Sequence, residues 1–207
     1  MRGFSDEERD QIREQLMDQG LTLFSTYGPR KTTIDDITQP VGIAHSTFYL
    51  FFDSKEELIE EIVHEQRKQF MTLIEDELGE ISDAQSGLET LFRVHAEWLE
   101  GNQFLQQVFF AQQLEEAVSA LPQDVVEENR RELMHELTAY IEAMQDCDGR
   151  ILREVEPMVV IGLLSTNAFL VSNKEMFESY DPTYYEDLKE TLISSLARGL
   201  TTHPDGD

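Results

Sequence analysis

The 207-residue sequence has one cysteine, few lysines and no long apolar run, and each of these shortages excludes a class of protein. Because Cys147 has no second cysteine to pair with, an intrachain disulfide is impossible, which agrees with a reducing compartment. The longest apolar stretch, residues 157–171, is too short and too polar to span a bilayer, and the N-terminus lacks the apolar core of a secretory signal. We therefore expect a soluble cytoplasmic protein that has no membrane partner.

Positive charge is scarce as well. The sequence holds 16 Lys and Arg against 42 Asp and Glu, which gives a formal net charge of -26 at pH 7. The acidic residues are spread through every segment instead of forming a tail, as in proteins of extreme halophiles, so the composition predicts a halophilic origin. The alternative is an acidic mesophilic protein whose charge keeps it away from nucleic acid.

Apolar residues recur at helical spacing along most of the chain, and no segment shows the sustained alternation that is typical of a strand. The sequence therefore predicts an all-α protein with about nine helices. Ser5, Thr33 and Ser54 are the expected N-caps of three of them. The first four helices are expected from Ser5 to Gly28, from Ile34 to about Gln39, from Ala44 to about Phe51, and from Lys55 to about Leu78.

The helices expected beyond Gly79 are longer. One contains Leu88 to Leu99, one begins at Phe104, one runs from Pro122 to near Gly149, one runs from Pro157 to about Asn173, and the last contains Tyr185 to Leu196. The fourth of these is apolar on almost every side, so we expect another surface to cover it.

The second and third helices, with a glycine-containing turn from Pro40 to Ile43 between them, form the pattern of a helix-turn-helix. In that motif the second helix enters the major groove of DNA, where small and hydroxyl side chains allow a close approach and reach base edges. The residues with this expected role are Ala44, His45, Ser46 and Thr47. The residues expected to contact phosphates are Thr32 or Thr33, Tyr49, and Lys55 at the start of the fourth helix.

Residues 32–58, TTIDDITQPVGIAHSTFYLFFDSKEEL, resemble the DNA-binding signature of the TetR family of transcriptional regulators. The Gly-Ile, Thr-Phe-Tyr, Phe and Ser-Lys-Glu-Glu-Leu pieces have the family's order and spacing, and the resemblance covers about the first 65 residues. It implies a helix-turn-helix DNA-binding domain at residues 1–54 and a helical effector-binding and dimerisation domain at residues 55–207, connected by the helix from Lys55. It also implies a homodimeric regulator, which we expect to be a repressor, that binds a pseudo-palindromic double-stranded DNA operator and releases it when an effector binds.

Four residues depart from the family's usual pattern. Ala44 stands where the family usually has a Ser or Thr cap, and Pro40 lies near the end of the second helix, which a proline can shorten. Leu50 and Phe51 replace positions that are often polar or basic. These departures leave the number of phosphate contacts open.

Aromatic and methionine side chains cluster on the apolar faces of three consecutive helices in the second domain. Together they suit a pocket for a small apolar or aromatic effector, with His95 as its best polar anchor, whereas for each residue taken singly an ordinary core is the simpler explanation. The expected effector-binding residues are Phe92, His95, Trp98, Phe109, Met134 and Tyr140. The apolar helix from Pro157 is expected to pair with the last helix in a four-helix bundle across the twofold axis of a homodimer.

Catalytic and metal-binding patterns are missing from the sequence. The His and Cys residues are dispersed without the paired spacing of metal ligands, and no phosphate-binding loop or nucleophile elbow occurs, so we expect no metal, no cofactor and no enzyme. Two alternatives remain: a helical small-molecule or protein sensor whose helix-turn-helix is vestigial, and a helical enzyme without a recognisable catalytic constellation.

Overall fold

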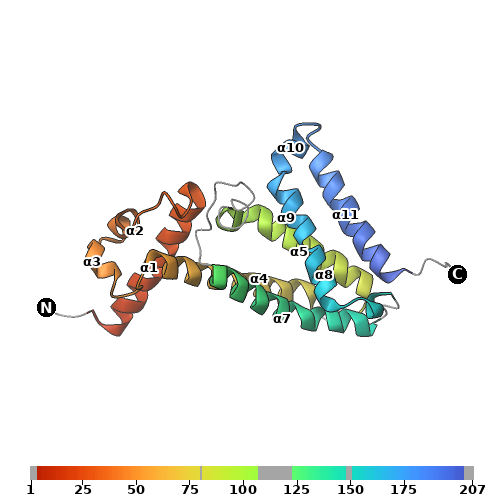
Figure 1. Ribbon diagram of the computed structural model, residues 1–207, viewed down its shortest axis with the longest axis horizontal. Helices are drawn as coiled ribbons and strands as arrows, with labels where there is room; N and C mark the ends of the chain where they lie inside the picture. The colour runs from red at the N-terminus through yellow and green to blue at the C-terminus, as the bar shows by residue number, and fades with distance from the viewer. Residues whose placement is uncertain (1–3, 80, 107–122, 148–150, 203–207) are drawn as a thin grey trace. The chain divides into compact units, whose positions relative to one another are not determined.

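The computed structural model of the protein describes residues 4–79, 81–106, 123–147 and 151–202 (Figure 1). All regular elements in these ranges are helices, which confirms the predicted all-α fold. The described residues divide into two compact units. Unit 1 comprises residues 4–67, 102–106 and 123–129, and unit 2 comprises residues 68–79, 81–101, 130–147 and 151–202. This division falls inside the fourth helix, at a different position from the expected domain boundary after residue 54.

Unit 1 contains α1 (Asp6–Tyr27), α2 (Ile34–Val41), α3 (His45–Phe48), α6 (Gln103–Leu105) and the first part of α4 (Lys55–Leu78). The expected caps begin α1 and α2. The Ser5 hydroxyl accepts the Glu8 N–H at 3.2 Å, and the Thr33 hydroxyl accepts the Asp36 N–H at 3.2 Å. In both cases the acidic side chain accepts the N–H of the cap residue in return, so that two backbone donors are satisfied at each helix start.

Helices α2 and α3 differ in length from the expectation. Helix α2 continues to Val41 with Pro40 inside its last turn, two residues beyond the expected end. Pro40 lacks only one hydrogen-bond donor there, and the left-handed backbone of Gly42, with φ of 79°, closes the helix. Helix α3 ends at Phe48, since the residues up to 51 continue as turns.

The core of unit 1 forms where α1 and α4 approach each other closely. A Cβ atom at Gly20 would lie 3.0 Å from the Ile62 side chain and 3.1 Å from the Leu58 side chain, so a larger residue at this position would require both side chains to shift. Phe48 and Phe52 are buried with ring centroids 5.6 Å apart. Both side chains therefore belong to the core of unit 1.

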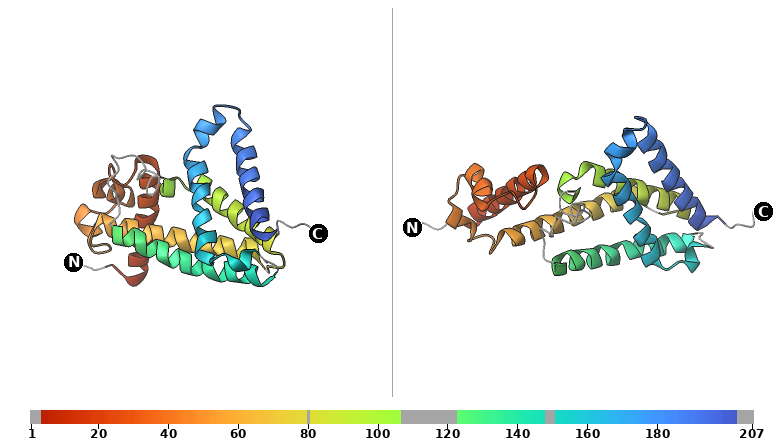
Figure 2. Two further views of the ribbon diagram at one scale, coloured as in Figure 1. Left: turned by 45° about the vertical axis from the view of Figure 1, so that its right-hand side comes forward. Right: turned by 45° about the horizontal axis from the view of Figure 1, so that its top comes forward.

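Unit 2 contains the remainder of α4, α5 (Ala84–Gly101), most of α7 (Gln123–Cys147), a 3₁₀ helix (Leu152–Glu154), α8 (Pro157–Leu163), α9 (Ser165–Ser172), α10 (Lys174–Glu178) and α11 (Tyr184–Thr201). The single helix expected from Pro157 to Asn173 is therefore two helices, which meet at Leu164. Helices α9 and α11 lie side by side, and α10 connects them (Figure 2). Within the described ranges no helix is long and apolar enough for a membrane span.

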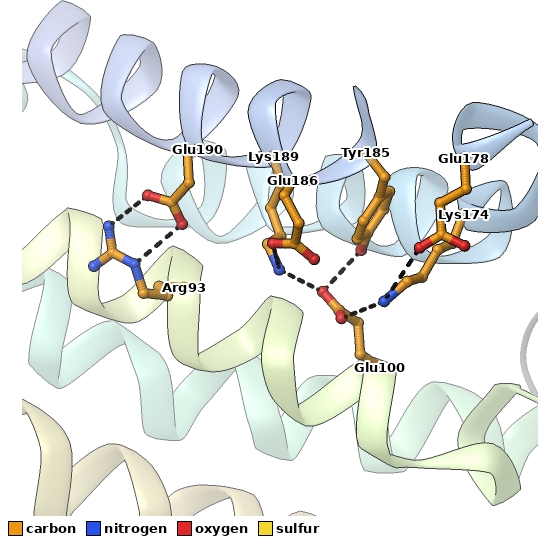
Figure 3. Close-up of polar contacts among 8 residues, drawn as sticks. All are labelled: Arg93, Glu100, Lys174, Glu178, Tyr185, Glu186, Lys189 and Glu190. Atoms are coloured by element: carbon orange, nitrogen blue, oxygen red, sulfur yellow. Dashed lines mark hydrogen bonds and ion pairs between the residues drawn. The ribbon is translucent and has the colours of Figure 1, made fainter. Parts of the chain in front are cut away.

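A partly buried carboxylate, Glu100, joins α5 to α10 and α11 inside unit 2 (Figure 3). One oxygen of Glu100 accepts hydrogen bonds from the Lys189 ammonium and the Tyr185 hydroxyl, both at 2.8 Å. The other oxygen accepts a bond from the Lys174 ammonium at 2.9 Å. Both ammonium groups also lie against the face of the Tyr185 ring, 4.7 and 5.3 Å from its centroid. We call these four residues the Glu100 cluster.

Burial and hydrogen bonding act in opposite directions on the charges of this cluster. Burial raises the pKa of Glu100, but the hydrogen bonds from Lys189, Lys174 and Tyr185 outweigh it, so that the pKa is lowered overall. Burial lowers the pKa of Lys189, and its bonds to the carboxylates of Glu100 and Glu186 raise it by more. Both groups are therefore charged at neutral pH, and the cluster depends on each of them.

We expect Glu100→Gln to lower the free energy of unfolding by about 2–3 kcal/mol, because it removes the charge that compensates the buried Lys189 ammonium. Urea unfolding followed by circular dichroism measures this loss. The matched control is Glu97→Gln, an exposed position on the same helix, with an expected change within about 0.5 kcal/mol. Equal losses in the two variants would contradict a stabilising role for the Glu100 cluster.

Candidate functional site

The turn between α2 and α3 is held by backbone hydrogen bonds to the end of α2. The Gly42 N–H donates to the carbonyls of Thr38 and Gln39, both at 3.1 Å, and the Ile43 N–H donates to Thr38 at 3.2 Å. Thr38 is buried, and its own hydroxyl donates to the Ile34 carbonyl at 3.0 Å. These bonds fix where α3 begins relative to α2, as a helix-turn-helix requires.

The segment from Ala44 to Tyr49 presents polar side chains at the surface of unit 1. Ala44, His45 and Ser46 are exposed, Thr47 is half-buried, and Tyr49 is 48% exposed. Ala44 is the N-cap of α3, and its methyl side chain cannot accept a hydrogen bond from the first backbone N–H groups of the helix. The structure thus brings together all the residues predicted to read base edges.

Two of the predicted phosphate contacts instead hold the loop before α2. Thr32 is buried, and its hydroxyl donates to the Gly28 carbonyl at 3.0 Å. The Lys55 ammonium donates to the carbonyls of Pro29 at 2.7 Å and of Thr32 at 2.9 Å. Thr33, in contrast, is exposed at the N-cap of α2. The Thr32 hydroxyl therefore stabilises the loop before α2 and does not belong to the candidate interface.

The N-terminal half of α1 packs against Leu50 and Phe51, the residues that depart from the TetR pattern. The Arg9 guanidinium donates to the Leu50 carbonyl at 3.2 Å and lies 5.5 Å from the centroid of the Phe51 ring. Phe4 covers the same ring, with centroids 6.2 Å apart. Phe51 is thus part of the contact between α1 and the turn after α3, while the Leu50 side chain stays 56% exposed.

Sequence reasoning missed one candidate cation. Lys31 is exposed in the turn directly before the N-terminus of α2, beside Thr33. Arg13, by comparison, pairs with Glu61 and lies over the Phe52 ring. The signal for Lys31 was available in the sequence, since it is one of the few cations near the glycine turn and flanks the cap of α2.

Carboxylates also border this surface, at the first turn of α2. Asp36 accepts hydrogen bonds from the Thr33 side chain and backbone, and these bonds lower the pKa of its carboxyl. Asp35, the preceding residue, lies 2.8 Å from the His45 ring, measured from Oδ1 to Nδ1. Any anionic partner of this surface therefore meets negative charge beside the hydroxyl and imidazole groups.

The predicted effector residues lie in or against the core of unit 2. Phe92 is fully buried, whereas Trp98, Met134 and Tyr140 are partly buried and pack against the same core. Phe109 lies outside the described residues. The Phe70 ring, which was not among the predicted residues, has its centroid 4.7 Å from that of Trp98 and 5.6 Å from that of His95.

His95, which is partly buried, and Asn167, which is fully buried, form a polar pair within that apolar environment. The Asn167 amide donates to the Phe92 carbonyl at 2.7 Å and lies 3.4 Å from Nδ1 of His95. Burial lowers the pKa of His95 to about 4, so its ring is neutral at pH 7. The Asn167 side-chain oxygen is buried and has no hydrogen-bond partner among the described residues. It is an acceptor that a ligand donor could use.

A separate surface hollow of about 440 Å³ lies between the end of α4 and α7. Tyr140 is the one predicted effector residue that lines it, together with Gly79, Ile81, Ala139, Ala143, Asp146 and Cys147. His95 and Trp98 do not line this hollow, so the structure distributes the predicted effector residues over more than one place. Within the described part of the chain no group of His, Cys, Asp and Glu could hold a metal ion.

Comparison with known proteins places the family resemblance in unit 1. Residues 16–62 match the sequence model of the family described as "Bacterial regulatory proteins, tetR family". The HTH-type transcriptional repressor KstR2 of Rhodococcus jostii is 43% identical over 51 residues, which are 25% of each chain. The negative transcriptional regulator IcaR of Staphylococcus aureus is 38% identical over 52 residues, 25% of this chain and 28% of that protein. The match thus spans about a quarter of these relatives' length.

The fold as a whole is shared with solved TetR-type structures. The fatty acid degradation regulator FadR from Bacillus halodurans has a TM-score of 0.70 at 18% identity, over 96% of this chain and 98% of the other. FadR from Bacillus subtilis, solved with stearoyl-CoA, has a TM-score of 0.66 at 19% identity, over 90% and 98%. A TetR-family regulator from Streptomyces coelicolor has a TM-score of 0.68 at 14% identity, over 93% and 97%.

We expect the protein to lose about 2 kcal/mol of stability between pH 7 and pH 5 through His95 alone. The folded pKa of about 4 lies below the unfolded value of 6.5, so the unfolded state binds a proton first and stability falls as the pH drops through this window. Urea unfolding at both pH values measures the loss, and His95→Gln should show less of it. An identical pH dependence in the two proteins would contradict a neutral His95 in the folded protein.

Proposed function

We propose that the protein is a transcriptional repressor of the TetR type that binds a pseudo-palindromic DNA operator as a homodimer. The observation that carries this proposal is the exposed segment from Ala44 to Tyr49, which follows the Gly42 turn. It lies inside residues 16–62, the part that matches the tetR family. The repressor activity of KstR2 and IcaR, which are similar to unit 1, supports the sign of regulation.

In this proposal α3 enters the major groove. Ala44, His45, Ser46 and Thr47 would face base edges, because they are the small or polar residues at the start of that helix. Phosphates would be contacted by Thr33, Tyr49 and Lys31, which are exposed around α2 and α3.

Lys55 has a more limited role in this interface. Its ammonium has three donors, and the carbonyls of Pro29 and Thr32 take two of them. One donor remains for a phosphate at the start of α4.

The charge balance constrains how DNA is bound. DNA and a chain of net charge -26 repel each other at low salt, whereas counterion release contributes little to binding at molar salt. We propose a halophilic origin for the protein, in which hydrogen bonds to bases and ordered water carry most of the affinity. The dependence of operator affinity on KCl concentration is then shallow.

We propose that dimerisation uses α8, α9 and α11. Met158 and Val159 of α8 and Phe169 of α9 are 48–55% exposed, and Tyr184 at the start of α11 is 45% exposed. Large apolar side chains on a surface favour an interface, and a second copy of the same helices buries them in a bundle across a twofold axis. In this bundle α8 and α9 together take the place of the single helix expected from Pro157.

The proposed effector is a small apolar or aromatic molecule that binds unit 2. His95 and Trp98 beside Phe70, or Tyr140 at the surface hollow, supply aromatic contacts, and the buried oxygen of Asn167 supplies a hydrogen-bond acceptor. Phe92 is fully buried and belongs to the core around them. Bacillus subtilis FadR, which has a similar fold, was solved with stearoyl-CoA, a ligand whose acyl chain is apolar.

A sensor with a vestigial helix-turn-helix is the second candidate. Two observations favour it: the pair of acidic residues, Asp35 and Asp36, in the first turn of α2, and the exposed Leu50 side chain. DNA binding decides between the two candidates.

We expect Thr47→Ala and Tyr49→Phe each to weaken specific DNA binding by about tenfold, because each removes a hydroxyl that contacts a base or a phosphate. Fluorescence anisotropy in molar KCl, with labelled duplex from the gene's own upstream region against scrambled duplex, measures this. Thr72→Ala, an exposed position on α4 in unit 2, is the control and should bind as the wild type does. Absence of sequence-specific binding at every KCl concentration would favour the vestigial motif.

We expect Phe169→Glu to convert a dimer to a monomer, since it places a charge in the proposed α8–α9–α11 interface. Sedimentation equilibrium measures the mass, which should fall from twice the chain mass to the chain mass. Tyr27→Glu changes an equally exposed aromatic residue in unit 1 and should leave the dimer intact. A monomeric wild type, or a Phe169→Glu variant that stays dimeric, would contradict this interface.

A further inference from the structure

Asp35 and His45 are joined across the helix-turn-helix. Asp35 lies in the first turn of α2, and His45 is the first residue of α3. Oδ1 of Asp35 is 2.8 Å from Nδ1 of His45, although the two residues are ten positions apart. Both side chains remain accessible, with 75% of Asp35 and 49% of His45 exposed. An exposed pair of this kind adds little to the stability of a fold. We therefore consider a role for the pair in binding at the surface of unit 1.

The ring of His45 is also held by its neighbour on α3. The ring centroids of His45 and Tyr49 are 5.7 Å apart. Tyr49 in turn packs edge-on against Phe48, at 5.5 Å, and Phe48 is fully buried. The position of the imidazole is therefore tied to the core of unit 1 through two aromatic contacts, in addition to its bond with Asp35.

The chemistry of the pair sets what the free edge of the imidazole can do. A carboxylate accepts hydrogen bonds and has none to donate, so Nδ1 of His45 must carry the hydrogen between them. In the neutral ring Nε2 is then an acceptor. Nε2 lies across the ring from Asp35, and among the described residues no hydrogen bond to it is recorded.

We propose that Asp35 fixes the tautomer and orientation of His45, so that Nε2 accepts a hydrogen bond from the exocyclic amino group of adenine or cytosine in the major groove. These amino groups are the donors that bases present in that groove. Asp35 is then a positioning residue for sequence readout, acting through His45. The inference rests on the proposed DNA-binding function and adds to it the chemical class of base that one position of each half-site must carry.

The same arrangement has an electrostatic consequence. The carboxylate of Asp35 lies where phosphates would approach, so it weakens binding to every sequence alike. Removing its charge should therefore raise affinity for random DNA while relaxing the preference at one position. If the pair had only a structural role, removing the Asp35 charge would not raise the affinity for random DNA while relaxing the base preference at a single position.

The test is selection from a pool of random duplexes, followed by sequencing, at about pH 8.5, well above the ordinary pKa of a histidine side chain. Wild type is compared with His45→Ala, Asp35→Asn and the double variant. Asp53→Asn is the matched control, since it removes one exposed carboxylate from the same unit without touching His45. Circular dichroism establishes that each variant is as helical as the wild type.

We expect the wild-type consensus to carry adenine or cytosine at one position of each half-site, with a preference of about tenfold. His45→Ala and Asp35→Asn should both lose that preference, because the asparagine amide can donate to Nδ1 and so permits the other tautomer. The double variant should lose no more than His45→Ala does, since Asp35 acts through His45. Asp53→Asn should keep the consensus.

Two results would overturn the inference in different ways. A wild-type consensus that Asp35→Asn retains, or that it relaxes equally at all positions, refutes the role of Asp35 and leaves the proposed repressor in place. Failure of the wild type to enrich any consensus, at every KCl concentration tried, refutes the DNA-binding function and this inference together.

Discussion

Positive charge is scarce in this protein, and both the packing of the helices and the candidate DNA interface reflect this scarcity. With 16 cationic residues against 42 acidic ones, the position of each cation matters. Lys55 ties the start of α4 to the backbone of the loop before α2, and Arg9 ties α1 to the turn after α3. Lys174 and Lys189 converge on Glu100 in unit 2. Several of the few cations therefore hold helices together and are not spread over the surface.

This use of cations shapes the candidate DNA interface. A helix-turn-helix usually binds phosphates through surplus positive charge, but here the surface around α3 offers hydroxyls, an imidazole and one exposed lysine, Lys31, beside two carboxylates. In our proposal such a surface distinguishes one DNA sequence from another by the geometry of its hydrogen bonds more than by its charge. The hydrogen bond between Asp35 and His45 fits this arrangement. In our proposal the Asp35 carboxylate lowers the affinity for DNA of any sequence, and it also fixes the orientation of the imidazole ring that contacts the base.

In unit 2 as well, polar side chains connect helices through hydrogen bonds. In the Glu100 cluster two ammonium groups share the Glu100 carboxylate and the face of the Tyr185 ring, and each also pairs with a second carboxylate, Glu186 for Lys189 and Glu178 for Lys174. His95 is kept neutral by burial, and Asn167 donates to a backbone carbonyl while its oxygen keeps an unused acceptor. This oxygen is an acceptor that a donor group of the proposed effector could use.

Features that depend on neighbours three or four residues apart could be predicted from the sequence. The capping boxes at Ser5 and Thr33, the stop at Gly42 and the bounds of α4 follow from local hydrogen bonds, and the spacing of residues 32–58 was enough to predict the helix-turn-helix. Tertiary structure decided what joins distant residues. The burial of Thr32, the Lys55 contacts 23 and 26 residues away, and the Glu100 bond to Lys189 across 89 residues depend on how helices pack, which no local pattern encodes.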